Sequence, residues 1–218
     1  MKDTLAIALS KGKLLEPALE LFKRVGLAPK DVSPDSRRLI FEHAASGTTL
    51  MIVRPSDVPT YVEAGAADIG IVGRDVINER RPDVYELLDL KFGDCRMVYA
   101  TAAGEDRTPE IIARMGVLRV ATKYPQVAEA HFLATGRQVE LVKVNGSVEL
   151  GPLVGLADGI VDLVATGRTL RENGLVEREE IFHSSARLVA NRVSHKLRAE
   201  DIDALTARLA RAVAAEAV

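Results

Sequence analysis

The residues with the clearest chemical potential form a short loop after an apolar segment. The candidate strand Ile160–Ala165 runs into Thr166-Gly167-Arg168-Thr169. A tight glycine turn that opens a helix can aim several backbone N–H groups and two threonine hydroxyls at one anion, above all a phosphate. A plain strand-to-helix turn with a threonine cap is the alternative, and spacing alone leaves both open.

Two carboxylates accompany this loop. Asp162 lies on the strand that leads into it, and Glu149 lies on the segment before that strand. A carboxylate beside a phosphate site is explained when the ligand is a sugar phosphate, because carboxylates accept hydrogen bonds from paired sugar hydroxyls. For both residues the alternative is an ordinary helix-end or surface carboxylate.

Basic residues stand beside several other candidate strands. Lys11 and Lys13 follow the first strand. Arg37 precedes the second strand, and Arg54 follows the third. A cation at the C-terminal end of a parallel strand points into the crevice where open α/β sheets bind ligands. Taken singly, each of these residues could equally be a solvated surface charge.

Short apolar runs alternate with helical periodicity along the chain, which predicts an α/β fold with a largely parallel sheet. Apolar residues recur at helical spacing in the segments 14–25, 127–134 and 202–213. The candidate strands are Leu5–Leu9, Arg38–Glu42, Leu50–Val53, Asp68–Val72, Met97–Thr101, Arg119–Thr122, Val139–Val144 and Ile160–Ala165. Such continuous apolar strands are typical of sheets covered on both faces.

The order of these elements predicts two α/β lobes. The polar segment Thr101–Pro109 is the best loop between two halves, and the charged run Val176–Glu180 is expected to return the chain to the first half. Lobe I should therefore comprise residues 1–95 and 180–218, including the C-terminal helix. Lobe II should comprise residues 96–179.

Two segments of the chain resemble each other. Asp68–Val76 and Asp162–Leu170 both read as acidic residue, apolar strand, Gly-Arg, polar residue and apolar residue. Any two strand–turn–helix units look alike to about this degree. The functional interpretation is that each lobe offers its strand ends to one shared cleft.

Composition excludes several function classes. Of 218 residues, 47% are hydrophobic, and 29 Lys plus Arg against 31 Asp plus Glu give a net charge of −2. This is a globular composition without the basic excess of a nucleic-acid binder. The single cysteine, Cys95, excludes a disulfide framework, and the four histidines lack metal-ligand spacing. Neither a P-loop nor a dinucleotide fingerprint occurs.

The sequence also contains no targeting or membrane signal. No apolar run approaches the length that spans a membrane. The run Leu5–Leu9 is too short for the core of a signal peptide. We therefore expect a cytoplasmic protein that binds neither nucleic acid nor membrane.

Longer motifs make the sequence recognisable. They run in one order through nearly the whole chain: Ala8–Lys13, Ser36–Ile40, Arg54–Val62, Ala67–Asp75, Asn145–Leu150 and Gly155–Leu170. Together they resemble the short form of the ATP phosphoribosyltransferases, the family that catalyses the first step of histidine biosynthesis. The resemblance implies two α/β lobes like those of type II periplasmic binding proteins, with the active site in the cleft between the lobes.

The resemblance also implies an activity. Adenine N1 of ATP attacks C1 of phosphoribosyl pyrophosphate (PRPP) and gives N1-(5-phosphoribosyl)-ATP and pyrophosphate, with Mg²⁺. The metal is expected to arrive on PRPP or pyrophosphate rather than on protein side chains. Two other interpretations stay open: a solute-binding module of the same fold, and a phosphoribosyltransferase with another acceptor, such as a free base.

Residues that match the family motifs receive roles from the resemblance. The loop that holds the 5-phosphate of PRPP is matched by Ala165, Thr166, Gly167, Arg168 and Thr169, and the ribose side by Glu149 and Asp162. The ATP side is matched by Lys11, Asp68 and Gly73, and the catalytic cations near the leaving pyrophosphate by Arg37, Lys13 and Arg54. Many relatives have arginine at position 13. Lys13 therefore offers a compact ammonium charge in place of a planar guanidinium that can form two parallel hydrogen bonds to a phosphate.

The resemblance finally implies partners. The long form of the family carries a C-terminal histidine-binding domain, and none is expected after the alanine-rich end of this sequence. Short-form enzymes pair with a regulatory subunit that looks like a histidyl-tRNA synthetase core. We therefore expect ATP and PRPP as substrates, a homodimer of the catalytic chain, and a hetero-octamer with the regulatory subunit.

Overall fold

The computed structural model describes residues 4–29, 32 and 36–215, which divide into two units. Unit 1 consists of Met1–Gly93 and Ser185–Val218, and unit 2 of Asp94–Ser184. The sequence predicts boundaries at 95/96 and 179/180. Both boundaries lie elsewhere in the structure, because one antiparallel strand pair of unit 2 extends as far as Cys95 opposite Ser184.

Unit 1 contains a six-stranded sheet, sheet A, in the order β2-β3-β1-β4-β11-β5. Its strands are β1 (Leu5–Ser10), β2 (Ile40–His43), β3 (Thr48–Val53), β4 (Ile69–Gly73), β5 (Val84–Asp89) and β11 (Ala186–Asn191). Only β3, β1 and β4 are parallel neighbours. β2 and β11 run antiparallel to their neighbours, so the predicted largely parallel sheet is in fact mixed.

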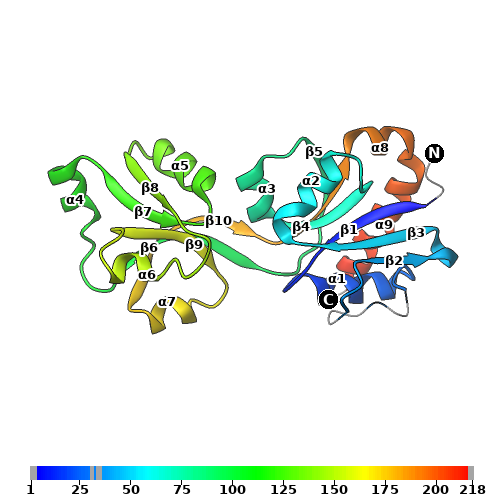
Figure 1. The fold of residues 1–218 in the computed structure, drawn as a ribbon, viewed down its shortest axis with the longest axis horizontal. Helices are drawn as coiled ribbons and strands as arrows, with labels where there is room; N and C mark the ends of the chain where they lie inside the picture. The colour runs from blue at the N-terminus through cyan, green and yellow to red at the C-terminus, as the bar shows by residue number, and fades with distance from the viewer. Residues whose placement is uncertain (1–3, 30–31, 33–35, 216–218) are drawn as a thin grey trace. The chain divides into compact units, whose positions relative to one another are not determined.

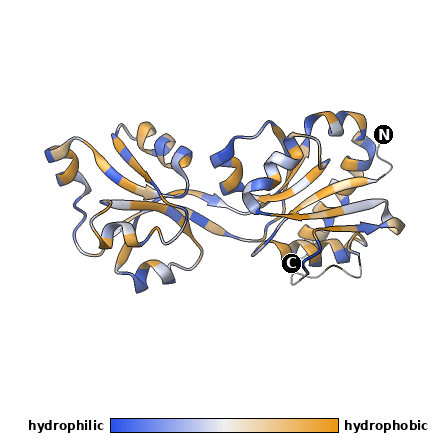
Figure 2. Cartoon of the chain, viewed as in Figure 1, coloured by the Kyte–Doolittle hydropathy of each residue, from blue (hydrophilic) through white to orange (hydrophobic). Residues whose placement is uncertain are grey.

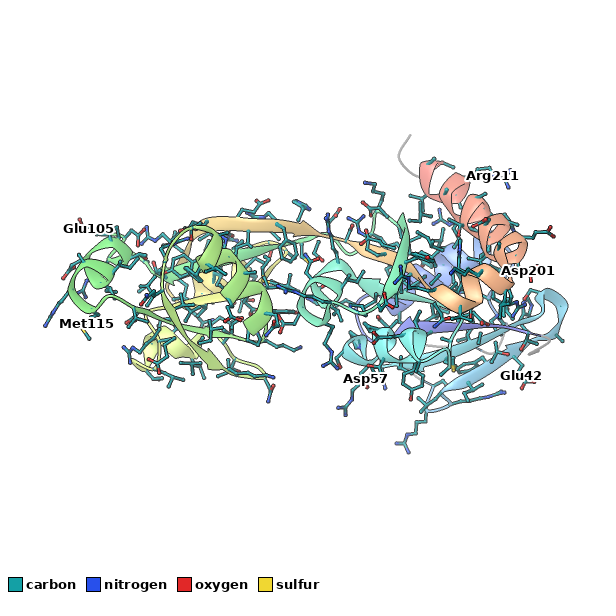
Figure 3. All side chains as sticks on the ribbon, turned by 90° about the horizontal axis from the view of Figure 1, so that it is seen from above. Glu42, Asp57, Glu105, Met115, Asp201 and Arg211 are labelled. Carbon is teal, nitrogen blue, oxygen red and sulfur yellow. The ribbon has the colours of Figure 1, made fainter. Side chains whose placement is uncertain are left out.

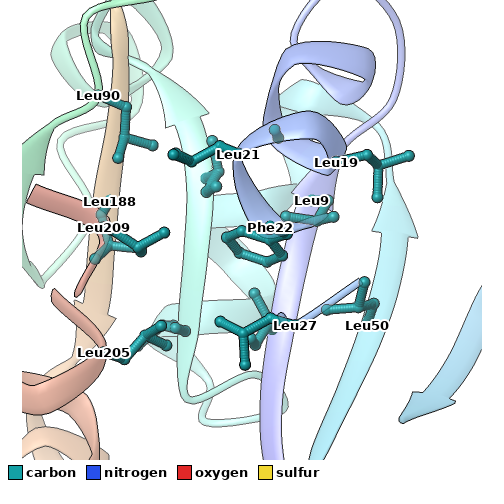
Figure 4. Packing of buried hydrophobic residues seen from close by; sticks show 14 of the residues in the cluster. Leu9, Leu19, Leu21, Phe22, Leu27, Leu50, Leu90, Leu188, Leu205 and Leu209 are labelled. Atoms are coloured by element: carbon teal, nitrogen blue, oxygen red, sulfur yellow. The ribbon is translucent and has the colours of Figure 1, made fainter. Parts of the chain in front are cut away.

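Helices cover both faces of sheet A (Figure 1). They are α1 (Leu15–Arg24), α2 (Val58–Glu63), α3 (Arg74–Arg80), α8 (Arg192–Leu197) and α9 (Ala199–Ala214), with 3-10 turns η1 (Ala44–Ser46) and η2 (Pro55–Asp57). The larger core lies between the strands and helices α1 and α9, where Phe22, Leu205 and Leu209 meet Leu9 and Leu188 (Figure 4). Fully burying each such side chain contributes about 1.5–3 kcal/mol. The C-terminal helix therefore belongs to unit 1, as predicted.

Unit 2 contains a five-stranded sheet, sheet B, in the order β10-β6-β9-β7-β8. Its strands are β6 (Cys95–Ala102), β7 (Leu118–Thr122), β8 (Val139–Lys143), β9 (Gly159–Val164) and β10 (Leu175–Ser184). Its helices are α4 (Thr108–Met115), α5 (Pro125–Ala134), α6 (Leu150–Leu153) and α7 (Arg168–Glu172). Two buried clusters, one with Phe132 of α5 and one with Leu170 of α7, pack against strands of this sheet.

Hydropathy follows this layering. Figure 2 shows hydrophobic residues concentrated in the strands of both sheets, with hydrophilic residues on the helices and loops. Among the residues that the structure describes, no helix is both long enough and apolar enough to cross a membrane.

Candidate functional site

Two cations lie side by side where β1 and β3 of unit 1 end. These parallel strands pair Ser10 with Val53, the last residue of each strand. The backbone N–H of Lys11 then donates to the carbonyl of Val53 at 2.8 Å. Lys11 and Arg54 are therefore neighbours at the C-terminal edge of sheet A, where α/β sheets bind ligands.

Arg37 reaches the same edge from an antiparallel strand. β2 pairs Ile40 with Met51, and the N–H of Ile52 donates to the carbonyl of Leu39 at 2.8 Å. Arg37 lies two residues before Leu39, in a bend near the same end of the sheet as Arg54. Lys11, Arg37 and Arg54 are called the cationic edge below.

The charges of the cationic edge are uncompensated. All three side chains are exposed, and none has an ion-pair partner among the described residues. Like charges at neighbouring strand ends repel each other, although salt screens exposed charges. A polyanionic ligand would remove that repulsion, which makes this edge a candidate anion site.

Lys13 and Gly73 lie next to this edge. Lys13 is exposed in the turn before α1, where Gly12 has a φ of +95°. Gly73 ends β4 and precedes α3, which begins with the exposed Arg74. Sequence analysis did not select Arg74 as a site residue, although its place directly after a strand is the signal that selected Arg54.

Gly73 has a steric reason to be glycine. A Cβ built on it would lie 2.1 Å from Oδ1 of Asp75, a buried carboxylate. We expect Gly73→Ala to lower the free energy of unfolding by about 1–3 kcal/mol, because Asp75 would have to leave its buried position. Urea denaturation measures this, with Gly146→Ala as the control, since a Cβ there meets nothing within 4 Å. An unchanged midpoint for Gly73→Ala would show that Asp75 moves freely.

Asp68 does not join the cationic edge. It precedes β4, at the opposite end of that strand from Gly73. Its Oδ2 accepts the N–H of Ala6 at 2.8 Å, and its Oδ1 accepts the hydroxyl of Ser194 at 2.7 Å. Arg198 Nη1 lies 3.4 Å from Oδ2. In the structure Asp68 therefore ties β1 and α8 together, and its predicted ATP contact stays a prediction.

The predicted phosphate loop of unit 2 has the expected backbone form. Gly167 adopts a φ of +71° between β9 and α7, and Ala165, Thr166 and Thr169 are exposed. The N–H groups of Gly167, Thr169 and Leu170 have no hydrogen-bond partner among the described residues. Unpaired backbone donors in a turn that opens a helix are able to bind an anion.

The loop arginines differ from expectation. Arg168 donates through Nε to Glu172 at 2.7 Å, so its side chain follows the exposed surface of α7 instead of the loop. Arg171, which sequence analysis did not select, donates through Nη1 to the carbonyl of Thr166 at 3.1 Å. The cation closest to the loop backbone in these contacts is therefore Arg171. Its position one helical turn after Arg168 on α7 is the sequence signal that could have identified it.

Glu149 and Asp162 influence each other. The pKa of Asp162 is raised to about 6, chiefly by burial and in smaller part by the charge of Glu149, while the N–H of Leu163 and the charge of Lys123 act in the opposite direction. The two carboxylates thus lie near each other, as their predicted shared role requires. Lys123, exposed just after β7, was missed by sequence analysis, although a lysine after a buried strand resembles the Lys11 signal.

The described residues contain no group of three or more His, Cys, Asp or Glu side chains placed to hold a metal ion. The carboxylates of Glu149 and Asp162 form a pair at most. Mg²⁺ often takes one or two carboxylates and completes its shell with water and substrate phosphate oxygens. The pair therefore fits Mg²⁺ only together with a phosphorylated substrate.

Comparisons of the sequence with known proteins give consistent matches. The family model for ATP phosphoribosyltransferase matches residues 54–211. The ATP phosphoribosyltransferase of Syntrophotalea carbinolica is 48% identical over 217 residues, which cover 100% of this chain and 99% of that protein. The enzyme of the same name from Caldanaerobacter subterraneus is 50% identical over 207 residues, 95% of this chain and 96% of that protein.

Comparisons of the fold agree with those of the sequence. A chain of the ATP phosphoribosyl transferase (HisG:HisZ) complex from Thermotoga maritima matches with a TM-score of 0.83 and 33% identity, covering 96% of this chain and 98% of that one. The periplasmic aliphatic sulphonate binding protein SsuA from Escherichia coli matches with a TM-score of 0.60 and 12% identity, covering 98% and 74%. The second likeness concerns the fold alone, and it confirms the predicted likeness to periplasmic binding proteins.

Proposed function

The chain belongs to the ATP phosphoribosyltransferase family, and on this premise we propose that it joins ATP to PRPP in the first step of histidine biosynthesis. In this reaction a bond forms between adenine N1 and ribose C1, and the bond from C1 to the pyrophosphate oxygen breaks. The products are N1-(5-phosphoribosyl)-ATP and pyrophosphate. The observation that carries the proposal is the 48% identity, over nearly the full length of the chain, to an enzyme of this name. Both units also contain groups that are able to bind anions.

Unit 1 supplies the groups for the negatively charged triphosphate and the leaving pyrophosphate. The cationic edge, Lys11, Arg37 and Arg54, is exposed and uncompensated among the described residues. Lys13 adds a further positive charge from the adjacent turn. These cations lower the energy of a transition state in which negative charge builds on pyrophosphate.

Unit 2 supplies the groups for the phosphoribosyl moiety. The free N–H groups of Gly167, Thr169 and Leu170 bind the 5-phosphate, together with the hydroxyls of Thr166 and Thr169. Ala165 leaves room for the phosphate, because its side chain is a single methyl group. Arg171 adds a positive charge near the loop.

Glu149 and Asp162 bind the ribose hydroxyls. A carboxylate is the stronger acceptor for a hydroxyl donor when it is ionised. Asp162 has a pKa of about 6, so it is ionised at neutral pH and ready to accept these hydrogen bonds. Its charge also favours the positive charge that develops on the ribose as pyrophosphate departs.

No general base is required for the attack. Adenine N1 carries a lone pair and no proton, so nothing must be removed before the C–N bond forms. The chain's residues act by holding two polyanions in line and by stabilising the departing charge. Mg²⁺ bound with the substrates would neutralise part of the phosphate charge, and the neighbouring carboxylates of Glu149 and Asp162 are the groups of unit 2 that could contribute ligands to it.

A regulatory partner completes the proposal. The matched Thermotoga maritima chain comes from a HisG:HisZ complex. By likeness to that chain, we assign this protein a HisZ-like regulatory subunit with the core of a histidyl-tRNA synthetase, in a hetero-octamer built on dimers of the catalytic chain.

Product formation tests the proposed function. Purified chain with ATP, PRPP, Mg²⁺ and pyrophosphatase should give a species with the mass of phosphoribosyl-ATP, either alone or after a HisZ-type subunit is added. Adenine and guanine in place of ATP serve as competing acceptors. Adduct formation on a free base alone would overturn the acceptor assignment, and PRPP binding without turnover under all conditions would favour a binding module.

The phosphate loop gives a separate prediction. Thr166→Val and Thr169→Val are each expected to raise the KM for PRPP about ten- to a hundredfold, because each removes one hydrogen bond from a hydroxyl to the charged 5-phosphate. The KM for ATP should stay within twofold. Thr135→Val is the matched control, since that hydroxyl bonds to the carbonyl of His131 at the end of α5. Unaltered PRPP kinetics in both loop variants would remove the loop from the site.

A further inference from the structure

The loop between β9 and α7 contains carbonyl groups as well as N–H groups. Carbonyl oxygens only accept hydrogen bonds, so a loop that binds a phosphate through its N–H groups must direct its carbonyls elsewhere. Gly167, the residue before α7, has no side chain with which to cap the helix. The hydroxyl of Thr166 accepts the N–H of Arg168 at 3.4 Å, which is a long hydrogen bond. These side chains of the loop therefore do little to fix the direction of its carbonyls.

Arg171 of α7 holds two carbonyl oxygens of this loop. Its Nη1 donates to the carbonyl of Thr166 at 3.1 Å, and its backbone N–H donates to the carbonyl of Gly167 at 3.1 Å. The described residues contain no cis peptide bond, and in a trans peptide group the N–H points opposite to the C=O. Because Arg171 holds the carbonyl of Thr166, the N–H of Gly167 in the same peptide group points away from Arg171.

We propose that Arg171 is a positioning residue for the 5-phosphate of PRPP. Its guanidinium keeps the Thr166 carbonyl on the back of the loop and thereby directs the Gly167 N–H toward the phosphate, without touching the phosphate itself. The proposal rests on the proposed function for the identity of the ligand, and it explains how the loop is prepared for that ligand.

A second charged group lies on the same side of the loop as Arg171. A Cβ built on Gly167 would lie 2.9 Å from Nη1 of Arg171 and 3.1 Å from Oε1 of Glu177. The guanidinium and the carboxylate are therefore neighbours on one side of Gly167. A carboxylate repels a phosphate, so the phosphate is expected on the opposite side, where the Gly167 N–H points.

Sheet B fixes this carboxylate in place. Arg96 forms two contacts with Glu177, from Nη1 to Oε2 at 2.8 Å and from Nη2 to Oε1 at 3.1 Å. Arg96 lies on β6 opposite Val164, the last residue of β9, which leads into the loop. Paired contacts of this kind restrict the geometry of both side chains. The negative charge held there favours keeping the guanidinium of Arg171 behind the loop.

The other role open to Arg171 is a direct contact with the phosphate. A guanidinium can form two parallel hydrogen bonds to a phosphate, but Arg171 would then leave the Thr166 carbonyl and move away from Glu177. The positioning role keeps both of these contacts. The two roles differ in the ligand-free protein, because only the positioning role makes the order of the loop depend on Arg171 before any phosphate binds.

Kinetics of Arg171 variants give the first test. Arg171→Met should raise the KM for PRPP roughly five- to thirtyfold, because it removes a charged donor from a backbone carbonyl at an exposed position. The 5-phosphate takes no part in the bonds that form and break, so kcat and the KM for ATP should stay within twofold. Arg171→Lys keeps a charged donor and should raise the KM for PRPP less than Arg171→Met does.

Nuclear magnetic resonance of the ligand-free protein gives the second test. The backbone amide signals of Gly167 and Thr169 should be shifted and broadened in Arg171→Met relative to wild type. Arg114→Met replaces an exposed arginine in the last turn of α4 and is the matched control, which should leave both signals and the PRPP kinetics unchanged. Ribose 5-phosphate is the probe, and its addition should shift the Gly167 signal of the wild-type protein. Thermal midpoints show that each variant is folded.

The outcomes separate this proposal from the proposed function. An unaltered KM for PRPP in Arg171→Met overturns the positioning role. A raised KM with unaltered ligand-free signals also overturns it, because the guanidinium then acts on the phosphate directly. A wild-type loop that does not respond to ribose 5-phosphate overturns both this proposal and the ligand assigned to the loop.

A wild-type chain that binds PRPP but forms no adduct overturns only the proposed function. Isothermal titration calorimetry then replaces kinetics as the measure of PRPP binding. In that case a dissociation constant raised about as much as the KM above, together with changed ligand-free signals in Arg171→Met, leaves the positioning role of Arg171 standing.

Discussion

Replacing Arg37 by alanine is expected to lower kcat by about 10²–10³-fold while the protein stays folded. Arg37 lies two residues before Leu39, which pairs with Ile52 of β3, near the end of sheet A where Arg54 and Lys11 follow their strands. No described residue pairs with its guanidinium, so its charge is available to a ligand. A donor that meets the departing pyrophosphate acts chiefly in the transition state, so its loss lowers kcat more than it raises KM.

Steady-state kinetics with saturating ATP and PRPP measure this effect. The matched control is Arg211→Ala, an exposed arginine on α9 that lies outside the cationic edge, and it should keep kcat within twofold (Figure 3). Arg37→Lys shows whether the positive charge alone suffices, because lysine keeps the charge but cannot form the paired hydrogen bonds of a guanidinium. A thermal midpoint equal to wild type shows that the loss is functional. An Arg37→Ala enzyme with wild-type turnover would remove Arg37 from the mechanism.

The strands that sequence analysis identified share one property. β1, β4 and β9 are apolar runs buried on both faces, and continuous hydrophobicity is a signal that needs no knowledge of neighbours. Three strands were missed, and two of them, β10 and β5, lack this property. β10 carries the charges of Val176–Glu180, which sit on an edge strand half in solvent, and these charges were interpreted as a return loop.

The other two missed strands explain the mixed topology. β11 follows β10 after one residue, so the turn that would separate two strands is absent from the sequence. β5 is partly exposed along its length, so its apolar residues do not form a continuous run. Both strands are antiparallel to their neighbours, and antiparallel pairing depends on contacts between distant segments that a local pattern does not contain.

The site residues also divide into those that a local motif reveals and those that only the fold brings together. The phosphate loop could be found because its glycine and threonines stand in one short segment. The convergence of Arg37 with Arg54 depends on strand register, which spacing along the chain does not give. Asp68 and Gly73 belong to one sequence motif, yet they flank opposite ends of β4, which the motif alone does not reveal. Arg168 and Arg171 could be told apart only by their side-chain directions.

Replacing Asp162 by asparagine is expected to stabilise the protein and to weaken PRPP binding. The folded-state pKa of Asp162 is about 6, above the ordinary value of 3.8, so at neutral pH its ionisation costs about 3 kcal/mol of folding free energy. Asparagine is uncharged and still accepts the N–H of Leu163, which lies 2.8 Å from Oδ1. Losing the charged acceptor for ribose hydroxyls should raise the KM for PRPP about ten- to a hundredfold.

The pH dependence fixes the sign of this prediction. Asp162 holds its proton more tightly in the folded than in the unfolded chain, so its contribution to stability falls as pH rises from about 4 to about 6. Asp162→Asn removes that fall, so the gain over wild type should be near zero below pH 4 and complete above pH 6. Urea denaturation from pH 4 to 8 measures it. Glu140→Gln, an exposed carboxylate on β8, is the control and should give no pH-dependent gain.

The two readouts of Asp162→Asn are opposite in sign, which makes the experiment selective. A purely structural carboxylate would give a stability change without any effect on PRPP. If Asp162 is buried beside Glu149 in order to bind the ligand, its replacement by asparagine should both raise the stability of the protein and weaken PRPP binding. A variant that is less stable than wild type at pH 7.5 would contradict the raised pKa, and one that binds PRPP normally would contradict the ribose contact.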